Sequence, residues 1–265
     1  MKATWVTWNW ACGGVVLGLL LALVVFAPAA WLAHLMANAS GQQLLLADAR
    51  GTVWRGSARV VLTGGPGSRN AAALPGRLTW RWGLKNGEIE FRARQECCLN
   101  DELKLRLLPS IGRLKITLVP TAGPVGRWPA AWLVGLGAPW NTLQPGGSLR
   151  LASPGFSLEA VQGRWIFDGR AELAIEQATS RLVPLEALGS WKLVVDGEPG
   201  GGENARFVLS TLQGPLMLSG EGLWAGAKLR FRGEARAAPG AENALNNLLN
   251  IIGRRQGALS VLSIG

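Results

Sequence analysis

Side chains that commonly carry catalysis or bind metals are scarce in this sequence. It has no tyrosine and a single histidine, His34, at the end of a long apolar run. Nucleophilic triads need a base inside the domain, and zinc sites need several histidines or cysteines. The Gly-x-x-x-x-Gly-Lys-[Ser/Thr] phosphate loop is also missing. We therefore expect no enzyme activity, no catalytic residues, no cofactor and no metal.

Acidic residues are also few, 17 against 27 lysines and arginines, which gives a net charge of +10. Most stand singly among alternating apolar residues, as Glu88, Glu90 and Glu234 do, and solvated charges on strands are expected there. Glu159 and Asp168 could act as an acid/base pair, but nothing in the sequence selects them. The positive charge favours an anionic neighbour, either phospholipid headgroups or an acidic partner. The dispersed basic residues argue against nucleic acid.

Only three cysteines are present, and they allow several readings. Cys12 lies in the apolar run and receives no role. Cys97 and Cys98 are adjacent, so they could form a vicinal disulfide or a bond to another chain. They could also be ordinary thiols or a local bridge without a function, which the sequence favours.

The longest uncharged stretch covers residues 11–33 and is mostly aliphatic. A helix needs about 20 apolar residues to span a bilayer. We expect a transmembrane anchor over residues 11–35, kinked or ended at Pro28, with residues 1–10 in the cytoplasm because Lys2 precedes the run. Residues 36–50 are then a linker, and residues 51–265 form an exported, periplasmic, β-rich domain.

A cleaved signal peptide is the alternative for this stretch. Residues 27–29 and 37–39 both have small residues at the positions that a signal peptidase requires. The apolar part of a signal peptide is usually about 7–15 residues, however, and this run is longer. A retained anchor is therefore favoured, and the rest of the chain is exported in either case.

Alternation of apolar and polar residues predicts the body of the domain. It occurs in residues 77–84, 88–94, 102–107 and 113–118, and Asn86-Gly87 between the first two is a strong hairpin signal. With 36 glycines as turn and bulge residues, the fold class is mainly β, an antiparallel, curved, Gly-rich sheet. The sequence does not distinguish one curved sheet from two packed sheets.

Two helices are expected to accompany this sheet. Residues 128–140 break the alternation and predict a short apolar helix, with Pro129 at its first position. Residues 241–252 have the spacing of an amphipathic helix, ended by Gly253 with Arg254 and Arg255, whose stripe packs on the sheet or, less plausibly, docks onto a second protein. Residues 257–264 could add a closing strand.

Several motifs, in their order, resemble those of type II secretion system protein N, also called general secretion pathway protein N. These motifs follow the N-terminal anchor and lie in residues 51–56, 74–82, 136–147, 231–235 and 248–256, so the resemblance covers nearly the whole chain. Cys97-Cys98 has no counterpart in the pattern. The resemblance implies a single-pass inner-membrane accessory protein. It would contact other inner-membrane and outer-membrane subunits of the machine that exports folded proteins from the periplasm of Gram-negative bacteria.

The family also resembles, more distantly, the AsmA-like group, whose Gly-rich β units form curved grooves that handle lipid. This implies an alternative function, with phospholipid as the ligand. An exposed trough lined by Trp80, Trp82, Trp165 and Trp224 would favour the lipid groove. A face covered by the C-terminal helix would favour an ordinary core and a protein-binding module.

Overall fold

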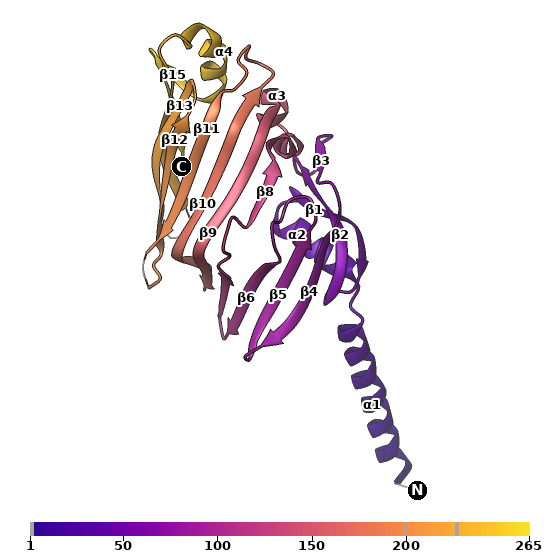
Figure 1. Cartoon of the computed structure of the whole chain (residues 1–265). Helices are drawn as coiled ribbons and strands as arrows, with labels where there is room; N and C mark the ends of the chain where they lie inside the picture. The colour runs from indigo at the N-terminus through magenta and orange to yellow at the C-terminus, as the bar shows by residue number, and fades with distance from the viewer. Residues whose placement is uncertain (1–2, 199, 226–227) are drawn as a thin grey trace.

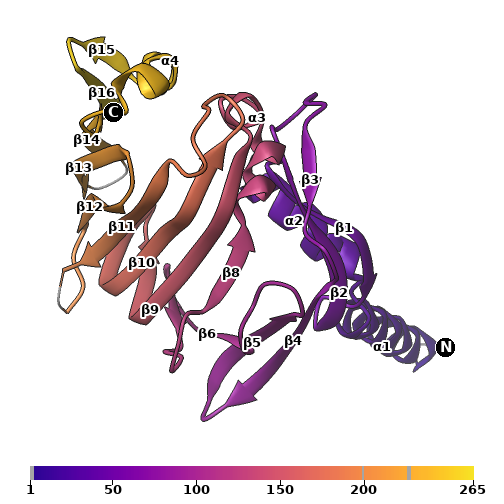
Figure 2. The ribbon, with the colours of Figure 1, turned by 45° about the horizontal axis from the view of Figure 1, so that its top comes forward.

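The computed structural model describes residues 3–198, 200–225 and 228–265, with side chains from Gly13 onward except at residue 225. The described residues form one strongly curved, 16-stranded antiparallel sheet, and α1 (Ala3–Val25) extends away from it (Figures 1 and 2). The predicted fold class, a mainly β antiparallel curved sheet, is confirmed. The strands form one curved sheet and not two packed sheets, a choice that the sequence left open.

The strands follow the chain order closely. In sheet order they are β1 (Leu44–Gly51), β2 (Arg55–Thr63), β4 (Leu78–Lys85), β5 (Glu88–Gln95), β6 (Leu103–Ser110), β7 (Arg113–Leu118), β9 (Pro145–Val161), β10 (Arg164–Ser180), β11 (Gly189–Gly197), β12 (Asn204–Gln213), β13 (Leu216–Ala225), β14 (Lys228–Ala237), β16 (Leu259–Ile264) and β15 (Arg254–Gln256). Two short strands lie off this path: β3 (Ala71–Ala73) pairs with β2, and β8 (Gly126–Pro129) pairs with β9. The expected closing strand over residues 257–264 is confirmed as β16.

The apolar N-terminal stretch is divided into two helices at Pro28, as the sequence predicts, but the second helix packs on the sheet and does not continue the anchor expected to reach residue 35. α1 ends at Val25, and α2 (Ala29–Ala39) begins after Pro28, whose missing N–H and fixed φ interrupt the helix. α2 packs on the sheet, where Ala29 is 1% exposed and lies in a cluster with Ala58 and Trp80. Among the residues with described side chains, no helix is long and apolar enough to cross a membrane.

Residues 36–50, expected as a linker, contain the end of α2 and nearly all of β1. Leu44, Leu45 and Leu46 lie opposite Leu62, Val61 and Val60 in the β1–β2 ladder. This apolar triplet gains burial by pairing with β2, which a solvated linker would not provide. The sheet therefore begins before residue 51.

The β4–β5 hairpin has the turn that the sequence predicts. Asn86 and Gly87 have φ angles of 53° and 80°, and Lys85 lies opposite Glu88. Positive φ at both central residues is the signature of a type I′ turn, which suits the twist of a hairpin. The turn sets the register of the whole hairpin, because the chain leaves it with fixed partners.

The single helix expected over residues 128–140 is replaced by three short elements. Trp128 and Pro129 end β8, a 3-10 helix η1 follows (Ala130–Leu136), and α3 (Trp140–Leu143) begins after a cis Ala138-Pro139 bond. Pro129 therefore precedes the helix instead of opening it. Two glycines and Pro139 within this segment prevent a continuous α-helix.

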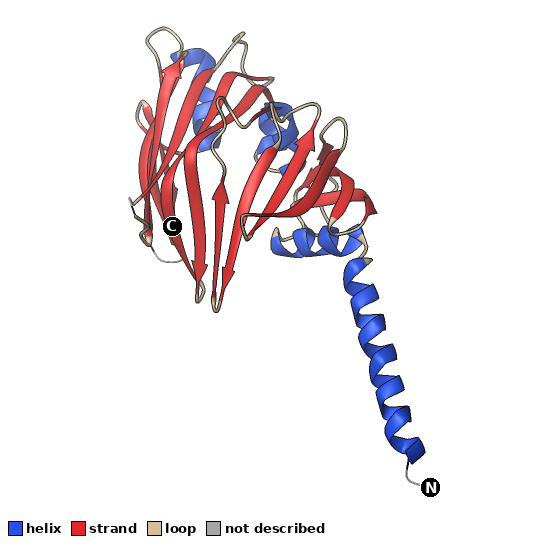
Figure 3. Ribbon diagram, turned by 60° about the horizontal axis from the view of Figure 1, so that its bottom comes forward, coloured by secondary structure: helices blue, strands red, loops and turns tan. Residues whose placement is uncertain are grey.

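The C-terminal amphipathic helix is confirmed as α4 (Glu242–Ile252), and its apolar stripe faces the sheet. Leu245, Leu248 and Leu249 are 0%, 2% and 1% exposed. Arg254 and Arg255, expected beside the end of the helix, belong to β15 instead, because Gly253 is extended and starts the next strand. Figure 3 shows the helices at the margins of one continuous sheet.

The apolar face of the sheet is its concave side. The rings of Phe167 on β10 and Trp224 on β13 have centroids 5.7 Å apart, although two strands lie between them. Rings from strands that are not neighbours approach one another on the inner side of a curve. The polar residues of the same strands therefore lie on the outer face, because side chains alternate.

Candidate functional site

Basic residues gather on the outer face of β2, β4, β5 and β6. The ladder places Arg55 opposite Arg81, Arg81 opposite Arg92, and Arg92 opposite Lys104. Four cations thus form a row across four strands. Like charges directly opposite each other destabilise a sheet, so this row needs compensation.

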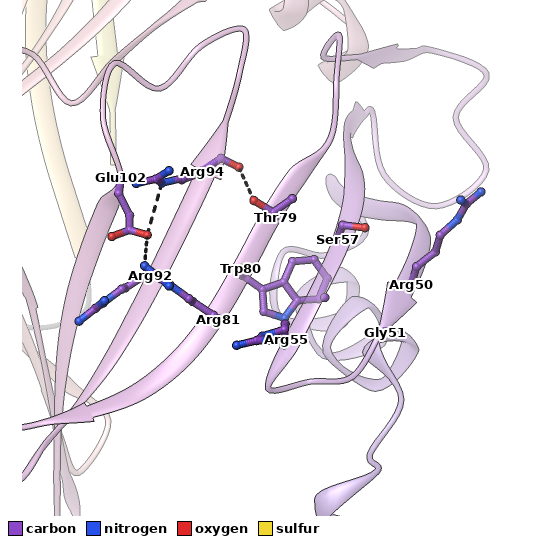
Figure 4. A pocket seen from close by; sticks show the side chains of 11 residues that line it. Arg50, Gly51, Arg55, Ser57, Thr79, Trp80, Arg81, Arg92, Arg94 and Glu102 are labelled. Atoms are coloured by element: carbon purple, nitrogen blue, oxygen red, sulfur yellow. Dashed lines mark hydrogen bonds and ion pairs between the residues drawn. The ribbon is translucent and has the colours of Figure 1, made fainter.

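An open pocket of about 740 Å³ lies over this row and is here called the arginine pocket. Figure 4 shows its lining side chains extending from neighbouring strands. The lining consists of Arg50, Gly51, Arg55, Gly56, Ser57, Thr79, Trp80, Arg81, Arg92, Arg94 and Glu102. Five guanidinium groups therefore share a lining with one carboxylate, which makes the pocket suited to an anion.

The carboxylate of the lining is already occupied by two of the arginines. Glu102, with a side chain 11% exposed, lies 2.8 Å from Arg81 and 3.4 Å from Arg94. Among the described residues, no ion pair or hydrogen bond is found for the side chain of Arg55. Positive charge in the pocket therefore exceeds the negative charge that its lining offers.

A second carboxylate, Glu90, lies two residues from Arg92 on the same face of β5, where the sequence led us to expect a solvated charge. Its residue is only 2% exposed, and it accepts a hydrogen bond from Arg92. Burial acts to raise the pKa of Glu90, but the hydrogen bond from Arg92 and the charges of Arg92, Lys85 and Lys104 together outweigh burial, so the pKa lies below its ordinary value. Glu234, by contrast, is exposed as expected.

The arginine pocket adjoins the end of α1. Arg50 and Arg55 flank the turn of residues 52–54, which joins β1 to β2. In this turn Val53 donates its N–H to the Ala27 carbonyl at 2.8 Å, and the Trp54 Nε1–H donates to the Val24 carbonyl at 2.8 Å. The position of the pocket relative to α1 is therefore set by direct hydrogen bonds.

Arg50 is held by an acid that it shares with a residue outside the pocket. Asp48 lies 3.0 Å from Arg50 and 2.6 Å from Arg77. Hydrogen bonds from Arg50 and Arg77 hold the pKa of Asp48 below its ordinary value. Asp48 therefore stays ionised, but its charge is divided between two guanidinium groups.

The arginine pocket is not predicted by the sequence as a whole, although one local signal points to part of it. The Asn86-Gly87 turn sets Lys85 opposite Glu88, and counting outward from it places Arg81 opposite Arg92. The position of Arg55 beside Arg81 depends on the pairing of β2 with β4, which joins segments separated by a loop and β3. That pairing has no local signal.

The concave face is the second candidate. Ladder partners place apolar side chains side by side across β4, β5, β6, β7 and β9: Trp82, Phe91, Leu105, Leu118 and Phe156. Of the four tryptophans proposed to line a trough, Trp165 is 38% exposed, and Trp82 and Trp224 are half-buried. Trp80 is 3% exposed, packs against Ala29 of α2 and does not contribute to an open trough on the concave face.

One end of the concave face is covered and encloses an apolar cavity. The cavity has a volume of about 190 Å³ and lies between α4, α3, η1 and the sheet. Leu248, Trp191 and Leu143 are among its lining residues. The same face is therefore a packed core at this end and partly exposed along β7 and β10, where Leu114 and Leu173 are 38% and 39% exposed.

The remaining candidates from the sequence are dispersed. Cys97 and Cys98 form a vicinal disulfide, one of the alternatives that the sequence left open, and Cys98 is buried beside Val60 and Leu74. Glu159 and Asp168 lie on neighbouring strands, and Glu159 is 3.8 Å from Arg113. The described side chains include no group of three or more metal-binding residues.

Comparison with known proteins places this architecture in a family. The model of the family "Type II secretion system (T2SS), protein N" matches residues 42–261, which include all of the strands from β1 to β15 and the first half of β16. No curated protein and no solved structure matches the chain at a significant level. Because the match covers most of its length, the chain belongs to the type II secretion system protein N family.

Proposed function

We propose that the chain is an inner-membrane accessory component of the type II secretion system that acts by scaffolding. The family match over residues 42–261 carries this proposal. In it, α1 anchors the chain in the inner membrane with residues 1–10 in the cytoplasm, and the sheet lies on the periplasmic side. There it contacts other secretion subunits and supports the export of folded proteins across the outer membrane.

Exposed apolar side chains on α1 support the anchor. Val15 and Leu19 are 69% and 61% exposed, their neighbours from residue 15 to 25 are similar, and Phe26 directly after the helix is 74% exposed. A contiguous apolar surface of this kind requires an apolar environment. The hydrogen bonds from Val53 and Trp54 to the end of α1 would then hold the sheet close to the membrane.

The contacts of the scaffold are expected on exposed side chains and strand edges. Leu248 and its neighbours on α4 are buried, so the apolar stripe of α4 is not the contact surface. Ile251, at the margin of the apolar stripe of α4, is 47% exposed, and Leu223 on the outer face of β13 is 55% exposed. β15 ends the order of strands and leaves an edge that another strand could extend.

Site-specific crosslinking in cells tests this proposal. A photoreactive residue is placed at Ile251, Leu223 or Arg255 in turn, with fully buried Leu245 as the matched control. Capture of a secretion subunit from an exposed position, and none from Leu245, is the expected result. Capture of lipid alone from every exposed position would contradict scaffolding.

A second function, lipid handling by the concave face, has one observation in its favour. Trp165, Leu114 and Leu173 expose more than a third of their surface on that face. On it the Trp82 Nε1–H is buried, with no hydrogen-bond partner among the described residues. Crosslinking from Trp165 and Leu173 distinguishes the two functions, because a lipid groove would capture phospholipid there and a scaffold would not.

A further inference from the structure

We propose that the arginine pocket binds the phosphate of an anionic phospholipid headgroup at the membrane surface. The inference rests on the proposed anchoring of α1, and it assigns to the outer face of the sheet a ligand that scaffolding does not require. The occupant is one headgroup held between β2, β4 and β5.

The charges of the pocket are the first argument. Arg55, Arg81 and Arg92 stand opposite one another in the ladder, with Lys104 next in the row. Directly opposite side chains on antiparallel strands have Cβ atoms about 4.5–5.5 Å apart, so their charges repel. Glu90 and Glu102 compensate Arg92, Arg81 and Arg94, and the side chain of Arg55 has no such partner among the described residues. A bound anion would relieve the repulsion that remains.

The shape of the groups is the second argument. A guanidinium group presents parallel N–H donors that match two oxygens of a phosphate, and several of them around one pocket can surround its charge. Ser57 and Thr79 add hydroxyl groups to the same lining. A phosphodiester with two free oxygens could thus accept from Arg55 and Arg81 on one side while its glycerol groups stay in the open mouth.

The position of the pocket is the third argument, and it selects a lipid over a soluble anion. Arg50, Gly51 and Arg55 adjoin the turn that is hydrogen-bonded to Val24 and Ala27 at the end of α1. With α1 in the hydrocarbon, this end lies at the interface, at the depth of the headgroups. Trp54 in the same turn is 45% exposed, and tryptophan is favoured at that depth.

Binding is measured on the full chain in micelles of a neutral detergent. The ligands are dihexanoyl phosphatidylglycerol, dihexanoyl phosphatidylcholine, inorganic phosphate and a poly-glutamate peptide, each titrated while the midpoint of thermal unfolding is followed by tryptophan fluorescence. Phosphatidylglycerol should raise the midpoint most, because a ligand of the folded state stabilises it. This measurement needs neither insertion into a bilayer nor the secretion machine.

The test variants are Arg55→Gln and the double variant Arg55→Gln/Arg81→Gln. Arg55 lacks a partner, and Glu102 keeps Arg94 when Arg81 is replaced, so neither variant leaves a buried charge unpaired. Losing one charged hydrogen bond should weaken phosphatidylglycerol binding about tenfold in the single variant, and further in the double. The matched control is Arg230→Gln/Arg232→Gln, which removes two exposed arginines of β14.

Four results would overturn the inference. Two concern the variants: unchanged affinity for phosphatidylglycerol in Arg55→Gln, or a loss of affinity in the β14 control equal to that in Arg55→Gln. Two concern the ligands: phosphatidylcholine or inorganic phosphate raising the unfolding midpoint as much as phosphatidylglycerol does. An equal effect of inorganic phosphate would indicate a site for the free anion. Stronger binding of poly-glutamate would assign the pocket to an acidic protein segment. Failure here leaves the crosslinking test of the secretion role unaffected, so the two proposals fail separately.

Discussion

Replacing Leu248 by alanine probes how α4 is attached to the sheet. Leu248 is 2% exposed, lies beside Leu245 and Leu249, and lines the apolar cavity of about 190 Å³ together with Trp191. The substitution removes three carbon atoms from a surface that already borders empty space. The new void therefore joins the existing cavity and becomes part of a larger one.

The magnitude follows from the behaviour of buried leucines. Leu→Ala substitutions in cores cost about 2.7–5.0 kcal/mol, and the cost grows by about 24 cal/mol for each Å³ of residual cavity. Here the cavity walls belong to β10, β11, β13 and the helices, which are held by the ladder and cannot close around the gap. We therefore expect a loss in the upper half of that range, about 4 kcal/mol.

The assay is equilibrium unfolding of the full chain in urea and neutral detergent, followed by tryptophan fluorescence. Trp191 lies in the same cluster as Leu248 and reports on it directly. Asn247→Ala, on the exposed side of α4, is the control and should change the free energy of unfolding by less than about 0.5 kcal/mol. Benzene should stabilise the Leu248→Ala variant more than the unmodified chain, since enlarged apolar cavities bind apolar ligands.

A loss of less than about 1 kcal/mol in the free energy of unfolding of Leu248→Ala would refute the reasoning, because a loss that small is typical of a substitution on the surface and not in a core. In that case α4 would be held by its ends, and the concave face beneath it would be open. A loss of the expected size without any response to benzene would mean instead that the cavity collapses.

Two other predictions concern the β4–β5 hairpin. Because the pKa of Glu90 is lowered by Arg92, its stabilisation is present above the ordinary glutamate pKa and is lost as pH falls through the lowered value. Urea unfolding at each pH should show that Glu90→Gln costs about 1.5–3 kcal/mol of stability at pH 7 and less in acid. Glu234→Gln, at an exposed position, should show neither effect. Equal costs of Glu90→Gln at both pH values would contradict the prediction. Gly87→Ala should lower the free energy of unfolding in urea by about 1 kcal/mol, because Gly87 has a φ of 80° although no atom would obstruct the added methyl group. Gly83→Ala is also unobstructed but has no positive φ, so it should cost less. Equal losses would contradict backbone strain as the cause.

Local signals predicted the parts of the fold that depend on neighbouring residues. The Asn86-Gly87 turn and the alternation on both sides of it were sufficient for β4 and β5, and the spacing of Leu245, Leu248 and Leu249 for α4. The break at Pro28 was also expected. In each case the chemistry that decides the structure lies within a few residues.

Features that depend on distant contacts could not be predicted. An apolar segment such as residues 29–35 can be buried by lipid or by a sheet, and only the contact of Ala29 with Ala58 and Trp80 decides between them. Glu90 lies between Gly83 of β4 and Arg106 of β6 and is buried, and the alternation of residues within β5 shows neither fact. The arginine pocket likewise depends on the pairing of β2 with β4.

The order of the strands also bears on how the chain is built. Most strands pair with the strand that precedes them in the sequence, and β16 closes onto β14 last. Contacts between residues that are near one another in the sequence form quickly, because only short loops must be closed to make them. The sheet can therefore grow hairpin by hairpin from its N-terminal end during synthesis, each new strand using the last as its template. The segment from α4 to β16 is added last, and α4 covers one end of the apolar face that the growing sheet leaves open.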